Sequence, residues 1–256
     1  MGEVQPLPSH GFSPRPQLLA TDMDGTLTRE GKFTPALLQG LEQLQAAGLP
    51  VMIVTGRSAG WVNGLAHYLP VAAGAMAENG GIYFPPNGPP EPLVEIPDLV
   101  AHRQLLHKAF SQLQWRWPQL HDSDDNRFRL TDWTFDIGGL TQADLDEMAL
   151  LCQSLGWGFT YSTVQCHLFT LGQSKAAGLQ RVIERYFAPL STTEVMTLGD
   201  SPNDESLFNP ALFPQSVGVA NIVDYWPRLT HRPTYVTQAA EVAGFLELVA
   251  ALEQKF

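Results

Sequence analysis

The sequence predicts an α/β fold in which a Rossmann-like, doubly wound parallel sheet carries a smaller, inserted α+β domain. Near the start and again near the end of the chain, short apolar runs of strand length alternate with amphipathic helical patterns, as in a parallel sheet covered on both faces. The alternation changes after residues 85–90, a segment of proline, asparagine and glycine that indicates a domain boundary. With 256 residues, of which 44% are hydrophobic, the chain can bury a sizeable core.

The elements of the sheet are expected from the short apolar runs and from residues that favour helix ends. Gly48 closes the first predicted helix, and Ser58 caps the second. Before the boundary we expect strands at 18–22, 50–54, 71–77 and 82–84 with helices at 35–47 and 58–69; late in the chain we expect helices at 174–187 and 239–252, strands at 195–198 and 217–220, and a short helix after Pro202.

The inserted domain is expected at residues 86–171, which leaves 17–85 and 172–256 for the core. Helical patterns at 99–115 and 142–155 alternate there with a strand at 128–137 and one or two strands within 159–171. In the strand at 128–137 the apolar residues change face halfway, so we expect a β-bulge near Thr131 and Asp132. Residues 1–16 contain four prolines and are expected to form a disordered tail.

Charge and composition restrict the partners of the protein. A formal net charge of −11 disfavours binding to nucleic acid or to an anionic membrane. The two cysteines, Cys152 and Cys166, are too few for a disulfide framework, and no apolar run approaches the roughly 20 residues of a membrane span. We therefore expect a cytoplasmic protein, a monomer or small homo-oligomer, whose partner is a small molecule.

Two acidic segments follow predicted strands that are far apart in the sequence. The first runs from Asp22 to Thr26 and contains Asp24, and the second, residues 199–204, contains Asp200 and Asp204. The carboxyl ends of parallel strands meet at one edge of a sheet, so four carboxylates would gather there. Such a concentration of repelling charges is best explained by a hard divalent cation, and oxygen ligands of this kind suit Mg²⁺.

These residues can carry phosphoryl-transfer chemistry. Asp22 could attack phosphorus to give an aspartyl-phosphate, and Asp24 could protonate the leaving oxygen and later activate water. The Thr55 hydroxyl and the Gly56 amide, at the end of another strand, could donate to a phosphoryl oxygen. Lys175 begins a predicted helix, where its ammonium group and the helix dipole both favour an anion.

In this order and at these strand ends, the four segments resemble the haloacid dehalogenase-like phosphohydrolases. The resemblance implies that Asp22 is the nucleophile, that Asp24 is the acid and base, and that Thr55 and Lys175 bind the phosphoryl group. It also implies that Asp200 and Asp204 bind Mg²⁺ together with Asp22 and the backbone carbonyl of Asp24. The placement of the insertion resembles the subclass IIB cap of sugar-phosphate phosphatases.

The resemblance implies a Mg²⁺-dependent phosphatase that acts on a small phosphorylated metabolite, in particular a sugar phosphate. Four polar residues of the inserted domain are candidates for gripping the substrate: Arg127, Arg129, Asp132 and His167. Two alternatives remain open at this point. One is a phosphosugar mutase of the same superfamily, and the other is a non-catalytic binding protein on the same scaffold.

Overall fold

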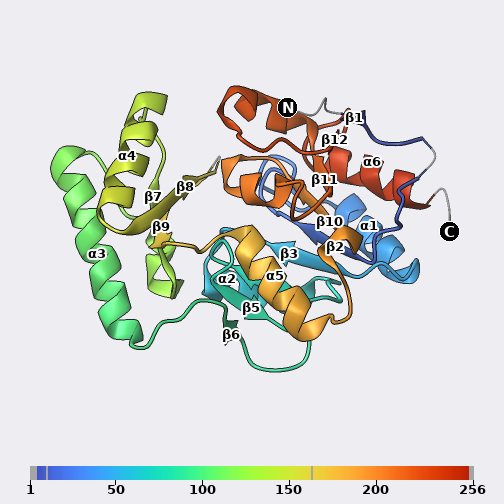
Figure 1. Ribbon diagram of the computed structural model, residues 1–256, viewed down its shortest axis with the longest axis horizontal. Helices are drawn as coiled ribbons and strands as arrows, with labels where there is room; N and C mark the ends of the chain where they lie inside the picture. Colours follow the sequence, from blue (N-terminus) through green and yellow to red (C-terminus); the bar gives the residue numbers. More distant parts are fainter. Residues whose placement is uncertain (1–4, 10, 163, 254–256) are drawn as a thin grey trace.

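The computed structural model describes residues 5–9, 11–162 and 164–253, which form two β-sheets in different parts of the molecule (Figure 1). The larger sheet has nine strands in the order β1-β12-β11-β10-β2-β3-β4-β5-β6, and the smaller has three in the order β7-β9-β8. All three strands of the smaller sheet lie between β6 and α5 in the sequence. The smaller sheet therefore belongs to a segment that is inserted between two parts of the larger sheet. The predicted fold class, a doubly wound sheet with an inserted α+β domain, is confirmed.

The larger sheet is parallel from β1 through β4, and β5 and β6 extend it in antiparallel fashion. The central strand is β2 (Leu18–Thr21), which pairs with β10 (Val195–Gly199) on one side and β3 (Val51–Val54) on the other. The remaining strands are β4 (Ala75–Ala77), β5 (Ile82–Phe84), β6 (Glu91–Pro92), β11 (Gln215–Gly218), β12 (Tyr235–Val236) and β1 (Gln5–Pro6).

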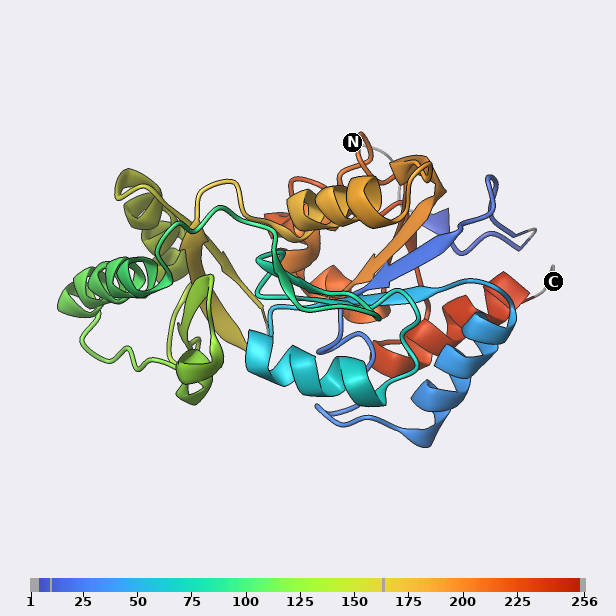
Figure 2. The same cartoon turned by 90° about the horizontal axis from the view of Figure 1, so that it is seen from below.

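Helices cover both faces of this sheet because successive strand residues point to opposite sides (Figure 2). Leu19 packs toward α1 (Pro35–Ala46), α2 (Ala59–Tyr68) and α6 (Glu241–Glu253), whereas Leu18 packs toward α5 (Lys175–Tyr186). Both faces of the sheet are therefore buried from solvent, and the polar groups of the core lie mainly at the strand ends. Three 3₁₀ helices complete this part: η2 (Thr192–Glu194), η3 (Pro202–Phe208) and η4 (Ala220–Arg228).

The smaller sheet has one apolar and one polar face. Its strands are β7 (Asp132–Asp136), β8 (Trp157–Tyr161) and β9 (Gln165–Thr170), and α3 (Leu99–Arg116) and α4 (Gln142–Ser154) cover one side. The apolar face packs on these helices through residues that include Phe135, Cys166 and Leu168. By strand alternation the opposite face carries Asp132, Thr134 and His167, and it is turned toward the larger sheet.

Two expectations about local structure are wrong. The strand predicted at 128–137 begins only at Asp132, because residues 124–128 form the 3₁₀ helix η1 (Asp124–Phe128). The change of apolar face that suggested a bulge instead marks the passage from this helix to β7. The amino-terminal segment is also not a disordered tail throughout its described part, because β1 forms a parallel pair with β12. Residues 1–4 and 10 lie outside the described residues.

None of the helices in the described residues is both long and apolar enough to cross a membrane.

Candidate active site

The strand order brings three separate sequence segments to one edge of the sheet. Asp22 follows β2, Asp200 follows β10 and Thr55 follows β3, and these strands are direct neighbours. All three run in the same direction, so their carboxyl ends coincide. Lys175, the first residue of α5, reaches the same edge from the helix layer. The structure thus brings together the core residues that the sequence predicts to act together.

A cluster of three carboxylates surrounds the Lys175 ammonium group. One oxygen from each of Asp22, Asp200 and Asp204 lies within 4.8 Å of the others, and all three residues are buried. The Nζ atom of Lys175 is 2.5 Å from Asp22 Oδ1 and 2.6 Å from Asp204 Oδ1. The side chains place three negative charges and one positive charge in a region without solvent, which leaves the cluster short of positive charge.

The pKa values of the cluster report this imbalance. Burial, reinforced by the charge of Asp204, raises the pKa of Asp22 to about 7 even though Lys175 opposes the shift. Burial and the charge of Asp22 also raise the pKa of Asp200 well above its ordinary value. Burial alone would lower the pKa of Lys175, but Asp204 and Asp22 outweigh it, and the pKa of the ammonium group is raised. The lysine is therefore a fixed cation.

Neighbouring groups hold the two carboxylates of the second acidic segment in place. Asp204 Oδ2 accepts from the backbone N–H groups of Asp200 and Ser201, at 2.9 and 3.2 Å. Asp200 Oδ2 accepts from Asn221 Nδ2 at 2.9 Å. A Cβ atom on Gly25, which has φ +79°, would lie 2.3 Å from Asp200 Oδ2, so the turn after Asp24 accommodates only glycine.

The donor set fits a magnesium ion. Hard oxygen ligands are what Mg²⁺ prefers, and the raised pKa values of Asp22 and Asp200 show that a further cation would be stabilising here. Asp204 has both oxygens engaged, one by Lys175 and one by backbone amides, so its carboxylate is less free than those of Asp22 and Asp200. The side chain of Asp24, predicted to contribute its backbone carbonyl, lies outside the carboxylate cluster.

Asp24 is held by Arg57, a residue that was not among the predicted site residues. Arg57 Nε and Nη2 donate to the two oxygens of Asp24 at 2.8 and 2.7 Å, and each side chain is 20% exposed. The guanidinium also lies over the ring of Trp61. The position of Arg57 directly after Thr55 and Gly56, at the end of a strand, is the sequence feature that could have indicated a role. The direction in which a side chain points after a turn does not follow from its place in the sequence.

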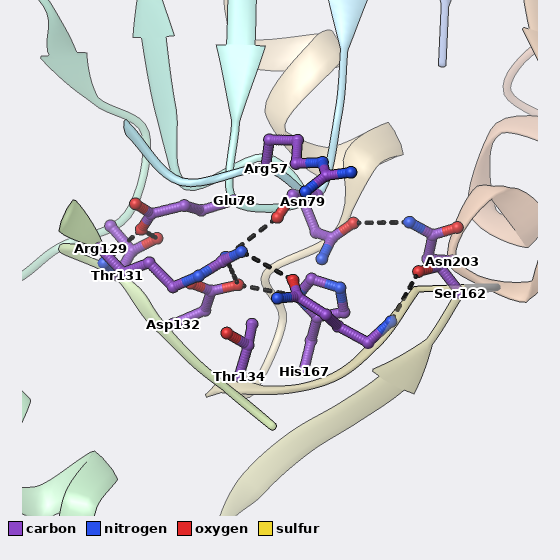
Figure 3. Close-up of polar contacts among 12 residues, drawn as sticks. Arg57, Glu78, Asn79, Arg129, Thr131, Asp132, Thr134, Ser162, His167 and Asn203 are labelled. Atoms are coloured by element: carbon purple, nitrogen blue, oxygen red, sulfur yellow. Dashed lines mark hydrogen bonds and ion pairs between the residues drawn. The ribbon is translucent and has the colours of Figure 1, made fainter. Parts of the chain in front are cut away.

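Two of the four candidate residues in the inserted domain form a buried ion pair with each other (Figure 3). Arg129 Nη1 donates to both oxygens of Asp132 at 2.9 Å and to the carbonyl of Gly56 at 3.0 Å. Its other nitrogens donate to Asp125 and Gln165. Arg129 thus joins the inserted domain to the turn after β3. All three of its guanidinium nitrogens donate to protein groups and are not available to a substrate. Arg127 is exposed, with its guanidinium over the ring of Phe128.

His167 contacts this ion pair and lines a cavity together with Asp22. Its Nδ1 atom is 3.0 Å from Asp132 Oδ2. A narrow cavity of ≈ 20 Å³, lined by Asp22, Asp24 and Thr55 from the core, is also lined by His167 from β9. Such a volume holds about one water molecule, so the inserted domain covers the site closely.

Glu78 and Asn79 lie between the strands predicted at 71–77 and 82–84 and were not candidate residues, yet both lie beside the candidate site. Both have φ +52°, which is uncommon for residues other than glycine. The Glu78 carboxylate accepts from the N–H of Ala59 in the core and from the N–H groups of Leu130 and Thr131 in the inserted domain. Glu78 therefore connects the two parts of the molecule, which no local pattern indicates.

Comparisons with known proteins agree with this geometry. A model of the haloacid dehalogenase-like hydrolases matches residues 19–88. Phosphoglycolate phosphatase of Metallosphaera sedula is 28% identical over 240 residues, which are 92% of this chain and 98% of that protein. A solved protein of Thermoplasma acidophilum has a TM-score of 0.75 at 23% identity and covers 93% of this chain and 99% of its own. A subclass IIB sugar phosphatase has a TM-score of 0.66 at 16% identity, with 93% and 98% covered.

The solved structures are less than 25% identical to this chain, so their likeness shows the fold alone. The sequence matches indicate the family. The resemblance to the haloacid dehalogenase-like phosphohydrolases that the motifs predicted is confirmed, because the family model matches residues 19–88 and curated relatives match over most of the chain. The curated relatives of this chain are phosphatases, that is, phosphoric monoester hydrolases.

Proposed function

We propose that this protein is a Mg²⁺-dependent phosphatase that releases phosphate from a small phosphorylated metabolite through an aspartyl-phosphate on Asp22. The buried group of Asp22, Asp200, Asp204 and Lys175 at neighbouring strand ends is the observation that carries the proposal. A sugar phosphate is the substrate class that we favour. Phosphoglycolate, after which the curated relatives are named, is the second candidate.

The reaction proceeds in two displacements. An oxygen of Asp22 attacks phosphorus while the bond to the leaving oxygen breaks, and Asp24 gives its proton to that oxygen. A water molecule then attacks the aspartyl-phosphate, Asp24 takes up a proton from the water, and Asp22 is restored as inorganic phosphate departs. Asp22 Oδ1 is engaged by Lys175, so Oδ2 is the oxygen that we assign to the attack.

The surrounding donors stabilise the charge that develops on the phosphoryl oxygens. We assign this role to the Thr55 hydroxyl, the Gly56 amide and the Lys175 ammonium group, which act in a region from which water is excluded. Mg²⁺, held by Asp22, Asp200 and the segment containing Asp204, would supply further positive charge to neutralise the phosphate when it is bound.

Arg57 must release Asp24 before protonation can occur. A carboxyl group that accepts two hydrogen bonds from one guanidinium is in its ionised form, whereas a general acid carries a proton. We propose that the incoming phosphate ester, which is itself an anion, attracts Arg57 away from Asp24. The cavity of ≈ 20 Å³ requires that the inserted domain also moves to admit the ester, as lids do in other enzymes.

Phosphate release from an aryl phosphate and from a panel of sugar phosphates and phosphoglycolate tests this function. We expect turnover with Mg²⁺ and none with excess chelator. In Asp24→Asn, a single turnover of the aryl phosphate, whose leaving group departs without protonation, should leave a phosphoryl group on Asp22 that mass spectrometry detects, because the group that activates water is missing. Turnover in chelator would contradict the metal assignment. An isomerised phosphosugar without free phosphate would indicate a mutase instead.

A further inference from the structure

His167 is the predicted cap residue that both faces the nucleophile's cavity and keeps a ring nitrogen unengaged. Its Nδ1 atom contacts Asp132, whereas Nε2 makes no hydrogen bond to any residue that the structure describes. Nε2 lies 3.1 Å from the position that a Cβ atom on Gly56 would occupy. The nitrogen therefore sits directly above the turn that holds the phosphate-binding groups.

The contact with Asp132 decides which hydrogen bond Nε2 can make. Burial would raise the pKa of Asp132, but Arg129 and His167 outweigh it and lower the pKa, so Asp132 is a carboxylate and only accepts. The Nδ1 atom must then carry the proton of the imidazole. Burial lowers the pKa of His167 despite the opposing effect of Asp132, so the ring is neutral. Nε2 is left with a lone pair and is an acceptor.

An unpaired donor lies beside this acceptor. The hydroxyl of Ser201 donates to Asn203 Oδ1 at 2.8 Å, and Asn203 Nδ2 donates to Asn79 Oδ1 at 3.2 Å. This chain of bonds fixes the orientation of the Asn79 amide and leaves its Nδ2 buried without a partner in the described residues. Asn79 Oδ1 lies 3.2 Å from the same Cβ position on Gly56. His167 and Asn79 thus both approach the turn at Gly56, and between them they offer the acceptor and the donor that a hydroxyl group can satisfy.

The space beyond these two residues is large enough for a sugar, and several polar side chains line it. Asn203 lines the small cavity and also an adjoining cavity of ≈ 510 Å³. The larger cavity runs between the inserted domain and the core, and Thr160, Gln173 and Glu205 are among the residues that line it. Its volume falls within the range of ordinary ligand pockets. A leaving group that touches His167 can therefore continue past Asn203.

We propose that His167 Nε2 accepts a hydrogen bond from a hydroxyl group of the leaving alcohol, and that the substrate is a phosphate monoester of a sugar or polyol. Asp132 is the positioning residue that fixes the tautomer of His167, and Arg129 positions Asp132 and ties it to the Gly56 carbonyl. This inference rests on the proposed phosphatase function. It disfavours phosphoglycolate, whose carboxylate would face the lone pair of Nε2.

Matched pairs of substrates test the inference. Glycerol 3-phosphate is compared with propyl phosphate, and glucose 6-phosphate with cyclohexylmethyl phosphate, so that each pair differs chiefly in its hydroxyl groups. In the wild type, kcat/KM should favour the hydroxylated member of at least one pair by about tenfold, the value of one good hydrogen bond. In His167→Phe this ratio should fall to about one. The matched control His121→Phe, at an exposed position of the same domain, should keep the wild-type ratio.

Two kinetic outcomes would overturn the inference. One is an unchanged ratio in His167→Phe, and the other is a wild-type enzyme that prefers phosphoglycolate to every hydroxylated substrate. If no substrate, the aryl phosphate included, releases phosphate with Mg²⁺, the proposed function itself fails. These failures are distinguishable because the aryl phosphate lacks a leaving-group hydroxyl for His167 to recognise.

A spectroscopic measurement tests the hydrogen-bonding role without turnover. Imidazole ¹⁵N NMR of the wild type at neutral pH should show a His167 ring protonated on Nδ1 and not on Nε2. In Asp132→Asn the Nε2-protonated form should appear, because an amide can donate to Nδ1. Protonation of Nε2 in the wild type would overturn the assignment of this nitrogen as an acceptor, even if His167→Phe fails to fold.

Discussion

At the residue scale, the candidate active site is a cluster of buried charges in which Lys175 is the cation that pairs with the carboxylates. Lys175 is fully buried and pairs with both Asp22 and Asp204. Buried pairs of this kind are costly to break, because the remaining charge has no partner. The same residues are therefore expected to affect stability as well as turnover, and the two effects have to be measured separately.

Asp22→Asn should abolish turnover while the protein still folds. The amide keeps the shape of the carboxylate but is a far poorer nucleophile, and Lys175 retains its bond to Asp204. Phosphate release from an aryl phosphate measures the activity, and circular dichroism verifies the fold. Asp136→Asn, on the exposed edge of β7, is the matched control and should keep wild-type turnover. Similar rates for Asp22→Asn and the wild type would end the covalent mechanism.

Lys175→Met should destabilise the protein by about 3–5 kcal/mol, the usual effect of removing one partner of a buried ion pair. Methionine fills much of the volume of the lysine but leaves Asp22, Asp200 and Asp204 without a cation. Urea unfolding in the presence of a chelator measures the loss. Addition of Mg²⁺ should restore part of the stability but not the activity. A loss below about 1 kcal/mol would show that the carboxylates do not depend on Lys175.

At the scale of elements, Glu78 joins the turn after β4 to the start of α2 and to the segment that leads into β7. Its carboxylate accepts from Ala59, Leu130 and Thr131, and Gln173 donates to its backbone carbonyl. Arg129 makes a second connection to the carbonyl of Gly56. The inserted domain is thus attached to the core through buried polar contacts rather than through an apolar interface, and such contacts respond to protonation.

Glu78 should make the stability fall as the pH rises. Burial, with the charge of Asp132, raises the pKa of Glu78 from 4.5 to about 7. Between these values the folded protein binds more protons than the unfolded chain, so the free energy of unfolding decreases with rising pH, by up to about 3 kcal/mol. Urea unfolding between pH 4.5 and 8 measures the slope. Glu78→Gln should remove this contribution, and an identical pH profile in that variant would contradict the assignment.

At the scale of the whole molecule, the candidate site depends on one sheet that is built from two parts of the chain, before and after the inserted domain. The strands that carry Asp22 and Asp200 are adjacent although some 170 residues separate them, and the inserted domain covers the edge where they meet. A ligand that binds this edge therefore links the amino-terminal and carboxyl-terminal parts of the core, and it should stabilise the fold as a whole.

Mg²⁺ should raise the thermal unfolding temperature. A ligand at 100 times its Kd stabilises the folded state by about 2.7 kcal/mol, which corresponds to a shift of about 5–10 °C for a protein of this size. Calorimetry with Mg²⁺ and with chelator measures the difference. Asp200→Asn should lose most of the shift, whereas Asp136→Asn should keep it. An undiminished shift in Asp200→Asn would place the ion elsewhere.

The sequence by itself determined the class of fold and the strand ends at which the candidate site residues lie. Strand and helix patterns are local, and each acidic segment directly follows a strand, so the rule that parallel strands share one carboxyl edge was enough to bring Asp22, Asp200 and Thr55 together. Lys175 was found in the same way, from its place at a helix start. The nearly continuous apolar runs of β2 and β10 are also typical of strands that are buried on both faces.

Only the tertiary structure decided the roles of polar residues whose partners are distant in sequence. In the sequence, Arg129, Asp132 and His167 are equivalent as polar residues of the inserted domain. In the structure, Arg129 and Asp132 form an ion pair with each other, whereas His167 faces the cavity. Arg57, Glu78 and β1 were missed for the same reason. The direction and pairing of a side chain depend on which segments pack together, and that is decided by the burial of the whole chain, not by local periodicity.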